Sequence, residues 1–275
     1  MPVKSYKPYT PSRRGMSVVD YSELSRDKPE KSLLEPKKKT AGRNNQGRIT
    51  MRFRGGGSRR HYRLVDFARK HDEEAAVVKS LQYDPNRTAF IALIQYDSGK
   101  LSYIIAPDGL RVGELVASGS SVEIRPGNTL PLERIPDGST IHNIEMRPGQ
   151  RARLVRAAGT AAQLMAKEGK DAIIRLPSGE IRRIPQSCRA TIGRVSNTDN
   201  ANVKLGKAGR NRQRGRRPHT RGTAMNPTDH PHGGGEGKTN SGRPPCSPTG
   251  VMAKGFRTRK KSKAKKYLVK DRRVR

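Results

Sequence analysis

Short apolar runs separated by turn residues fill the middle of the chain, and their spacing predicts an antiparallel all-β structure. Three strands are expected first, at residues 75–83, 88–96 and 100–106. Further strands are expected at residues 139–146, 151–157, 161–169, 171–179, 180–185 and 190–195. The breaks between the runs contain Gly, Asp and Pro, which favour tight turns. We therefore predict two small β-barrels in tandem, an architecture that often binds nucleic acids.

Two of the predicted hairpins turn on a Ser-Gly pair, at Ser98-Gly99 and at Ser178-Gly179. The similarity is weak, because such pairs are common in hairpin turns. Most of the large aliphatic residues between the turns are expected in the barrel cores. The expected core residues are Val77, Ile91, Leu93, Ile104, Ile141, Ile144, Ile173 and Ile184.

Charge divides the chain into a nearly balanced centre and two basic ends. The sequence has 58 Lys and Arg against 24 Asp and Glu, for a formal net charge of +34. Residues 1–60 carry +11, residues 61–195 carry +5 and residues 196–275 carry +18. Segments so basic and so poor in apolar residues cannot bury enough surface to order alone. We therefore expect a polyanionic partner, most plausibly a nucleic acid.

This division predicts four regions: a basic extension at 1–60, barrels at 61–124 and 125–195, and a second basic extension at 196–275. No apolar run approaches the roughly 18 residues of a membrane span. The first residues lack the apolar core of a signal peptide. Cys188 and Cys246 match no metal or redox spacing, so we expect both to be reduced and no cofactor to be bound.

Arginine and glycine alternate through residues 41–63, where aromatic residues add flat stacking faces. Glycine permits close backbone approach, and arginine offers a planar fork to phosphate groups. The candidate RNA-binding residues here are Arg43, Arg48, Arg52, Arg54, Arg59, Arg60, Tyr62 and Arg63. On the barrels the candidates are Tyr83 and Arg87, with Arg147, Arg153, Arg156 and Arg175 as further possibilities.

After residue 195 the chain is again rich in Arg, Gly and Pro but not of low complexity, which suggests order imposed by a partner. The basic candidates there are Lys204, Lys207, Arg210, Arg212, Arg214, Arg216, Arg217, Arg221, Arg257 and Arg259. The segment at 224–250 has sharp turns and a run of glycines that RNA backbone could approach closely. Its candidates are Asn226, His230, His232, Gly233, Gly234 and Gly235.

Three catalytic interpretations of this segment are weaker than RNA contact or loop structuring. A phosphate-binding loop ending at Lys238 and Thr239 lacks its first glycine, because His232 stands there. A metal bound by Asp229, His230 and His232 would need adjacent residues to converge on one ion. A general base at His230 has no evident nucleophile. We expect no enzyme, although an ATPase using Lys238 and a DNA-binding protein of the nucleoid remain rival hypotheses.

Several strings in family order resemble large ribosomal subunit protein two, a universal family, in its bacterial type. They include KPYTPSRR, GRNNQGRIT, RFRGGGSRRHYR, LPLERIPDGSTIHNIEMRPG, RLPSGEIRRIPQSCRATIGRVSN and NPTDHPHGGGEG. The resemblance spans nearly the whole chain. It implies an OB-like barrel followed by an SH3-like barrel, with long extensions threading into the ribosome. The family usually has Trp, Trp and His where this chain has Gln213, Thr249 and Ser58.

The resemblance also implies the partners and the place of action. The expected partners are 23S-type large-subunit ribosomal RNA and neighbouring ribosomal proteins, with contact across the subunit interface. The loop around His230 is expected near the peptidyl-transferase region, where RNA carries the chemistry. We expect a cytoplasmic or organellar ribosome, no membrane and no homo-oligomer.

Overall fold

The computed structural model describes residues 3–237, 239, 242–256, 258 and 265–272. The chain divides into two compact units. Unit 1 comprises 1–38, 59–208 and 267–275, and unit 2 comprises 39–58 and 209–266. Each unit therefore combines segments from distant parts of the sequence. The four regions expected from charge stay a prediction.

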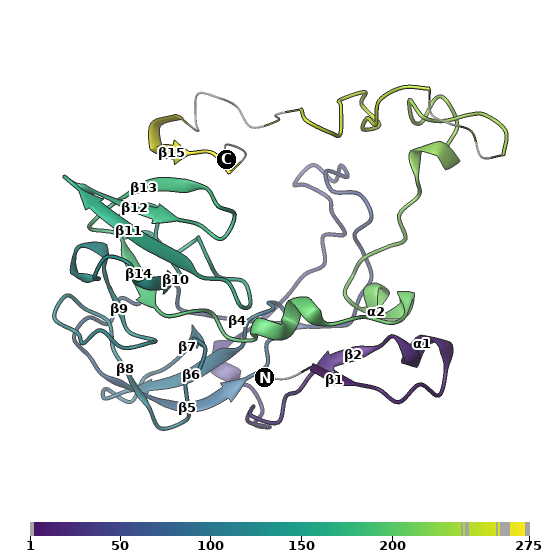
Figure 1. The fold of residues 1–275 in the computed structure, drawn as a ribbon. Coiled ribbons are helices and arrows are strands. Elements are labelled where there is room, and N and C mark those ends of the chain that lie inside the picture. Colours follow the sequence, from purple (N-terminus) through teal and green to yellow (C-terminus); the bar gives the residue numbers. More distant parts are fainter. Residues whose placement is uncertain (1–2, 238, 240–241, 257, 259–264, 273–275) are drawn as a thin grey trace. The chain divides into compact units, whose positions relative to one another are not determined.

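The first sheet of unit 1 has four antiparallel strands in the order β7-β6-β5-β8 (Figure 1). Its strands are β5 (Ala76–Gln82), β6 (Ile91–Tyr96), β7 (Leu101–Ile105) and β8 (Leu115–Val116). Gly99 turns the β6–β7 hairpin with a φ of 81°, and its N–H donates to Tyr96 O at 2.8 Å. Val78, Ile94 and Ile104 pack in the core of this OB-like barrel.

The second sheet has seven strands in the order β15-β13-β12-β11-β10-β14-β9. They are β9 (Thr129–Pro131), β10 (Thr140–His142), β11 (Ala162–Glu168), β12 (Asp171–Arg175), β13 (Ile181–Pro185), β14 (Arg189–Ile192) and β15 (Leu268–Lys270). Gly179 closes the β12–β13 hairpin with a φ of 82°, so both Ser-Gly turns are confirmed. Ile141, Ile174 and Ile184 lie in the core of this SH3-like barrel. The all-β class and the order of the barrels are confirmed.

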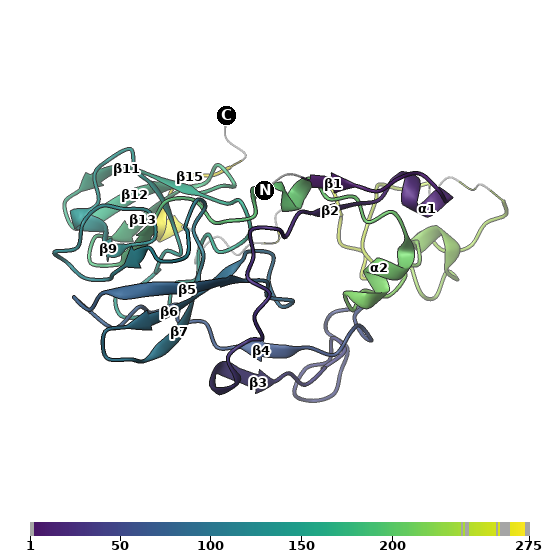
Figure 2. The same cartoon turned by 90° about the horizontal axis from the view of Figure 1, so that it is seen from below.

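Within unit 1 the two sheets lie beside each other (Figure 2). Pro107 pairs with Val195 in an antiparallel bridge, and Ser118 pairs with Thr129 in a parallel one. Val195 is fully buried in a small cluster with Phe67, Ala89 and Ile105. The barrels therefore share apolar surface and backbone bonds, so they form one compact body.

One expected strand is wrong and another is shorter than expected. Residues 151–157 form no strand, because Val155 has a φ of 54° and only Leu154 makes a bridge, to Ile144. Asn143 has a φ of 49°, so β10 stops at His142. A left-handed residue turns the chain out of the extended region and ends the ladder.

Three of the expected core residues are also wrong: Val77, Leu93 and Ile173 are only half-buried. Their strands carry three or four apolar residues in a row, so the sequence leaves open which of them point inward. Successive side chains point to opposite faces of a sheet. The core instead takes the immediate neighbours, listed in strand order as Ala76 and Val78, Ala92 and Ile94, and Ala172 and Ile174.

The N-terminal segment is more ordered than a bare basic extension. It forms β1 (Val3–Ser5), α1 (Pro11–Arg14), β2 (Ser17–Val19) and β3 (Leu34–Pro36), and β3 pairs with β4 (His61–Arg63). Val19 and Leu24 are buried in the core of the OB-like barrel. The hydroxyl of Tyr103 accepts the Glu30 N–H at 3.0 Å and donates to Gln82 at 2.9 Å. Two apolar anchors and one tyrosine thus tie this segment to unit 1.

The remaining elements are short. They are α2 (Ala208–Gln213) and the 3-10 turns η1 (Lys31–Leu33), η2 (Leu132–Arg134), η3 (Thr198–Asn202), η4 (Gly222–Ala224) and η5 (Lys265–Tyr267). β15 adds an edge strand to β13 from within the basic C-terminal extension. No described helix is long and apolar enough to cross a membrane.

Candidate nucleic-acid interface

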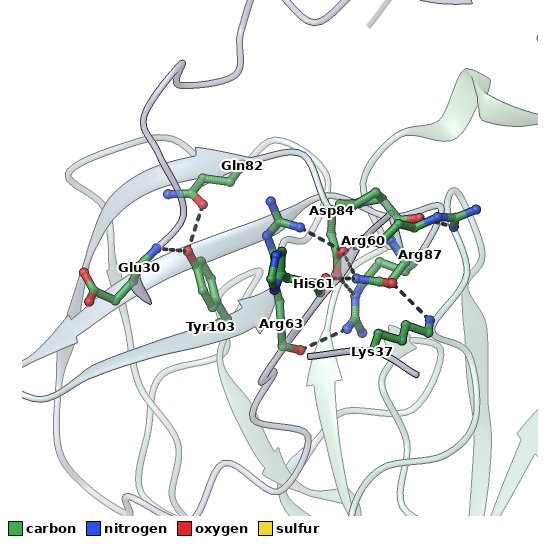
Figure 3. Close-up of polar contacts among 11 residues, drawn as sticks. Glu30, Lys37, Arg60, His61, Arg63, Gln82, Asp84, Arg87 and Tyr103 are labelled. Atoms are coloured by element: carbon green, nitrogen blue, oxygen red, sulfur yellow. Dashed lines mark hydrogen bonds and ion pairs between the residues drawn. The ribbon is translucent and has the colours of Figure 1, made fainter. Parts of the chain in front are cut away.

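A buried carboxylate organises the basic surface of unit 1 (Figure 3). Asp84 lies just after β5, and its side chain has no exposed surface. Its Oδ1 accepts from Arg63 Nη1 at 3.3 Å, and its Oδ2 accepts from Arg87 Nε at 2.5 Å. The backbone and side-chain nitrogens of Asn86 also donate to Oδ1, at 2.9 and 3.0 Å. One carboxylate thus holds two guanidinium groups that are themselves only 12% and 15% exposed.

The turn after β5 also forms hydrogen bonds with the β3–β4 strand pair and the residues beside it. Asn86 Nδ2 donates to the carbonyl oxygen of His61 at 2.7 Å, and Asn86 Oδ1 accepts from Lys37 Nζ at 3.0 Å. Arg60 Nη1 donates to the carbonyl oxygen of Pro85 at 2.6 Å. Basic side chains from two separate segments are therefore gathered around one turn (Figure 3).

Aromatic rings support the same basic side chains. The Arg87 guanidinium lies 5.9 Å from the Tyr62 ring centre and 5.5 Å from that of Phe67. Lys37 Nζ lies 5.9 Å from the Tyr62 ring, and the Arg156 guanidinium lies 4.5 Å from the Phe67 ring. Burial, and then the positive charge of Arg87, lower the pKa of Arg156. We call Lys37, Arg60, Arg63, Arg87 and Arg156 the cation cluster.

In unit 2, two arginine-glycine segments far apart in the sequence pair through their backbones. Residues 53–58 lie beside residues 213–217, and we call this pair the arginine-glycine ribbon. Its backbone N–H···O bonds run from Gly55 to Gly215 at 3.0 Å, from Ser58 to Gln213 at 2.9 Å and from Arg217 to Phe53 at 3.0 Å. Arg54 and Arg216 also face each other in an antiparallel bridge. Because the backbones bond to each other, the arginine side chains can point away from the ribbon.

Glycine makes this close pairing possible. Gly57 has a φ of 83°, and a Cβ built on it would lie 2.9 Å from Gly215 N and 3.0 Å from Gln213 O. Both neighbours are backbone atoms, which cannot move aside without breaking the ribbon. Next to it, the rings of Phe53 and His219 lie 4.4 Å apart.

The arginines of unit 2 are largely exposed. Among the described residues, those exposed are Arg43, Arg48, Arg52, Arg54, Arg212, Arg214, Arg216, Arg217, Arg221 and Arg243, whereas Arg210 is half-buried. Asp229 and Glu236 are the only acidic residues in the sequence of this unit. A hollow of about 390 Å³ beside the ribbon is lined by Lys39, Arg43 and Arg54 among others. Polyanion backbone fits such a surface because it supplies the charge that the unit lacks.

The histidine loop of unit 2 has its rings turned inward. His230 is only 7% exposed, and its Nδ1 accepts the His232 N–H at 3.0 Å. The two rings stack with centres 5.1 Å apart, and His232 Nε2 accepts the Cys246 N–H at 3.0 Å. A Cβ on Gly222 would lie 2.4 Å from the His230 ring. Burial, and then the positive charges of His232 and Arg52, lower the pKa of His230.

The glycines of this loop allow backbone conformations and close contacts that a side chain would prevent. A Cβ on Gly233 would lie 2.2 Å from Asn226 O, and Gly234 and Gly235 have φ values of 85° and 88°. The Gly234 N–H donates to Met225 O at 3.1 Å. Asn226 is exposed, whereas Gly233 and Gly234 are half-buried. Of the two roles weighed for His230, the geometry supports loop structuring.

The other sequence candidates are dispersed. Arg59, Tyr83, Lys204 and Lys207 are exposed in unit 1 outside the cation cluster. The Tyr83 ring meets the Tyr21 ring edge-on, with centres 5.4 Å apart. Arg257, Arg259 and Lys238 lie outside the described residues. Their expected roles stay predictions.

Sequence reasoning missed two residues that organise the cation cluster: Asp84 and Asn86. Asp84 and Asn86 stand in the string YDPNR, directly after an expected strand. Asp and Asn at such a turn bond nearby backbone, and Asp three residues before Arg can pair with it. That signal was present, but a search for basic residues passes over a carboxylate.

Comparison with known families accounts for most of the chain. The model of the RNA-binding N-terminal domain of ribosomal proteins L2 matches residues 30–118. The model of the C-terminal domain of ribosomal proteins L2 matches residues 125–250. The chain belongs to the ribosomal protein L2 family. Members of this family are structural, RNA-binding constituents of the large ribosomal subunit and not classical enzymes.

The structural features agree with that family membership. The N-terminal match spans the β3–β4 ribbon, the Asp84 turn and the four-stranded sheet, so the cation cluster apart from Arg156 lies inside the RNA-binding domain. The C-terminal match spans β9 to β14 and extends over the histidine loop. Within the described residues, no three His, Cys, Asp or Glu side chains are grouped to hold a metal ion.

Proposed function

We propose that the chain binds 23S-type ribosomal RNA through two surfaces, the cation cluster of unit 1 and the arginine-glycine ribbon of unit 2. On this proposal it acts in a cytoplasmic ribosome, beside neighbouring ribosomal proteins. It supports subunit association and the RNA of the peptidyl-transferase region. The observation that carries the proposal is the ribbon, whose exposed arginines flank two segments that three backbone hydrogen bonds hold together.

The ribbon favours phosphate over other ligands. Arginine forks suit the oxygens of phosphate groups, and release of condensed counterions drives such binding. Unit 2 has few apolar residues to bury and almost no carboxylates, so its positive charges repel one another until a polyanion binds. Folded RNA, with phosphates on several sides, suits a ribbon with arginines along both segments.

The cation cluster favours a structured contact. Its arginines are anchored by carboxylate, carbonyl and aromatic partners. An anchored guanidinium loses little side-chain freedom on binding. We infer that this surface recognises RNA by shape, while the ribbon supplies most of the charge.

For the histidine loop we propose a supporting role. His230 and His232 stack inside the loop and so set the path of the exposed residues around them. On this proposal the exposed face, which includes Asn226 and Gly235, meets RNA, and neither ring takes part in chemistry.

The first test is a filter-binding titration of the full chain with a 23S-type transcript at several salt concentrations. The logarithm of the association constant should fall by about 0.7–0.9 per phosphate neutralised for each tenfold rise in salt. Duplex DNA of equal length serves as competitor. A shallow salt dependence, or equal affinity for duplex DNA, would contradict the proposal.

The second test separates assembly from the finer role in the peptidyl-transferase region. Large subunits are reconstituted with wild-type protein and with the His230→Ala and Asn226→Ala variants. We expect the variants to enter subunits, and His230→Ala to lower both peptide-bond formation and joining to small subunits. Unchanged activity in fully loaded subunits would reject a supporting role for the loop.

A further inference from the structure

A negative charge at the centre of an RNA-binding surface is unexpected. A carboxylate repels phosphate, so a surface built only for charge would have none. Asp84 nevertheless lies completely buried between Arg63 and Arg87, within the cation cluster. Its burial keeps it away from any ligand, so its effect must pass through the groups bonded to it.

Asp84 leaves part of the Arg87 guanidinium available. In Arg87, Nε donates to Asp84, and Nη2 lies 3.5 Å from the carbonyl oxygen of Arg63. Within the described part of the chain, Arg87 Nη1 has no protein acceptor. Two aromatic rings, Tyr62 and Phe67, limit the remaining rotation of the same side chain.

Asp84 also acts on the neighbouring segment through Asn86. The two donations of Asn86 to Asp84 orient the amide, which then accepts Lys37 Nζ and donates to His61 O. Asp84 therefore positions Arg63 and Arg87 by direct hydrogen bonds. It positions Lys37 indirectly, through Asn86 (Figure 3). These cations come from β4, the turn after β5, and the end of the β3 segment.

We propose that Asp84 is a positioning residue for RNA binding: it pre-orders Arg63, Arg87 and Lys37, and this ordering outweighs its own repulsion of phosphate. The inference rests on the proposed function, since it requires RNA to contact the cation cluster. Counting charges alone predicts that removing a carboxylate strengthens RNA binding, whereas the inference predicts the opposite. Removing this negative charge weakens RNA binding.

The test compares Asp84→Asn with Glu35→Gln in the full chain. Both substitutions remove one negative charge and keep the size of the side chain. Glu35 is exposed on β3 and faces Tyr62 across the β3–β4 pair, so it samples the same surface. Affinity for a 23S-type transcript is measured at several salt concentrations.

We expect Asp84→Asn to weaken binding by about tenfold, because freed arginines must be ordered again on binding. The slope of the logarithm of its association constant against the logarithm of salt concentration should become shallower by an amount that corresponds to about one phosphate contact. A loss of stability alone does not produce such a change. Glu35→Gln should bind equally or slightly more tightly. Binding by Asp84→Asn at least as tight as that by Glu35→Gln would overturn the inference.

Two further variants keep the inference falsifiable if Asp84→Asn does not fold. Asn86→Ala leaves every charge in place and should weaken binding by about threefold through release of Lys37. Arg87→Gln tests whether Asp84 acts through Arg87. If it does, Asp84→Asn should weaken RNA binding less in the Arg87→Gln background than in the wild type. Full affinity in Asn86→Ala, or additive effects of Asp84→Asn and Arg87→Gln, would contradict the positioning role.

The outcomes separate the inference from the function on which it rests. If wild type and Glu35→Gln bind RNA with a steep salt dependence while Asp84→Asn is unchanged, only the inference fails. If wild type itself binds with no salt dependence or no preference over DNA, the proposed function fails and the inference falls with it.

Discussion

Arg189 on β14 and Asp72 in the loop before β5 form a two-point ion pair between the barrels of unit 1. Arg189 Nη1 and Nη2 donate to the two carboxylate oxygens of Asp72 at 2.5 and 2.6 Å. Arg189 Nη1 also donates to Arg69 O at 3.0 Å, and the Arg189 N–H donates to Glu145 at 3.1 Å. The hydrogen bonds that Arg189 donates to Asp72 raise the pKa of Arg189. This side chain thus adds a polar joint between the two barrels to the backbone bridges and the apolar cluster around Val195.

Replacing Arg189 by Lys should weaken this joint. Lysine keeps the charge but cannot donate to both oxygens and to Arg69 O in the same geometry. Because Asp72 is 46% exposed, we expect a modest loss, about 1 kcal/mol of unfolding free energy in urea. Lys167→Arg, elsewhere on the SH3-like barrel, serves as control. A loss no larger than that of the control would show that the joint contributes nothing.

His142 should make unit 1 less stable in mild acid. Burial lowers its pKa from 6.5 to about 4, and its Nδ1–H donates to Gly193 O at 2.9 Å. Above pH 6.5 both folded and unfolded chains hold a neutral ring. Below pH 6.5 the imidazole of His142 becomes protonated in the unfolded chain, whereas in the folded chain it stays neutral until about pH 4. Stability is therefore lost as pH falls from 6.5 towards 4, by about 2 kcal/mol at pH 5.

The check is the unfolding free energy of wild type and His142→Asn between pH 7.5 and 5. Asparagine has no titrating group, and its amide can still donate to Gly193 O. Burial raises the pKa of Glu145, which works in the opposite direction, so the difference between the two proteins is the informative quantity. Parallel curves for the two proteins would exclude His142 as the source.

The two thiols should differ sharply in reactivity. Cys188 is fully buried, and burial raises its pKa to about 12, so it holds almost no thiolate at pH 8. Cys246 is half-buried in unit 2. We expect iodoacetamide to modify the folded chain once, at Cys246, as read by mass spectrometry. Cys246→Ser should remain unmodified until the chain is unfolded, and labelling of folded Cys188 would contradict its assigned burial.

The sequence predicted the barrels well because strand alternation and turn residues are local signals. Gly99 and Gly179 each stand where a hairpin needs a left-handed residue, and both turns form there. It failed where the deciding contact is distant. The left-handed conformation of Val155 is disfavoured locally for a β-branched residue, so no local rule predicts it. Val19 becomes core only because unit 1 brings β2 to the OB-like barrel.

The candidate site divides in the same way. Composition alone identified the arginines of unit 2, because their exposure follows from the lack of apolar neighbours. It did not predict that residues 53–58 pair with residues 213–217, since nothing local connects segments so far apart. It also assigned His230 among RNA contacts, although the ring is buried by Gly222 and His232. The sequence shows which residues are basic or small. Only the fold shows which of them form contacts within the protein and which stay exposed.

The arginine-glycine ribbon gives the last prediction, which concerns Gly57. Gly57→Ala places a methyl group 2.9 Å from Gly215 N, so the two segments must separate. Gly56→Ala is the matched control, because Gly56 also has a positive φ, 64°, but nothing lies within 4 Å of its Cβ position. Both variants suffer backbone strain of about 1 kcal/mol, and only Gly57→Ala also suffers the clash.

We expect Gly57→Ala to abolish hydrogen-exchange protection at the Ser58 N–H and to weaken binding to a 23S-type transcript by about tenfold or more. Gly56→Ala should retain protection and lose no more than about fivefold in affinity, the cost of the strain alone. The contrast depends on one pair of backbones in contact. Equal losses in the two variants would mean that strain, and not the pairing of residues 53–58 with residues 213–217, governs how this surface binds RNA.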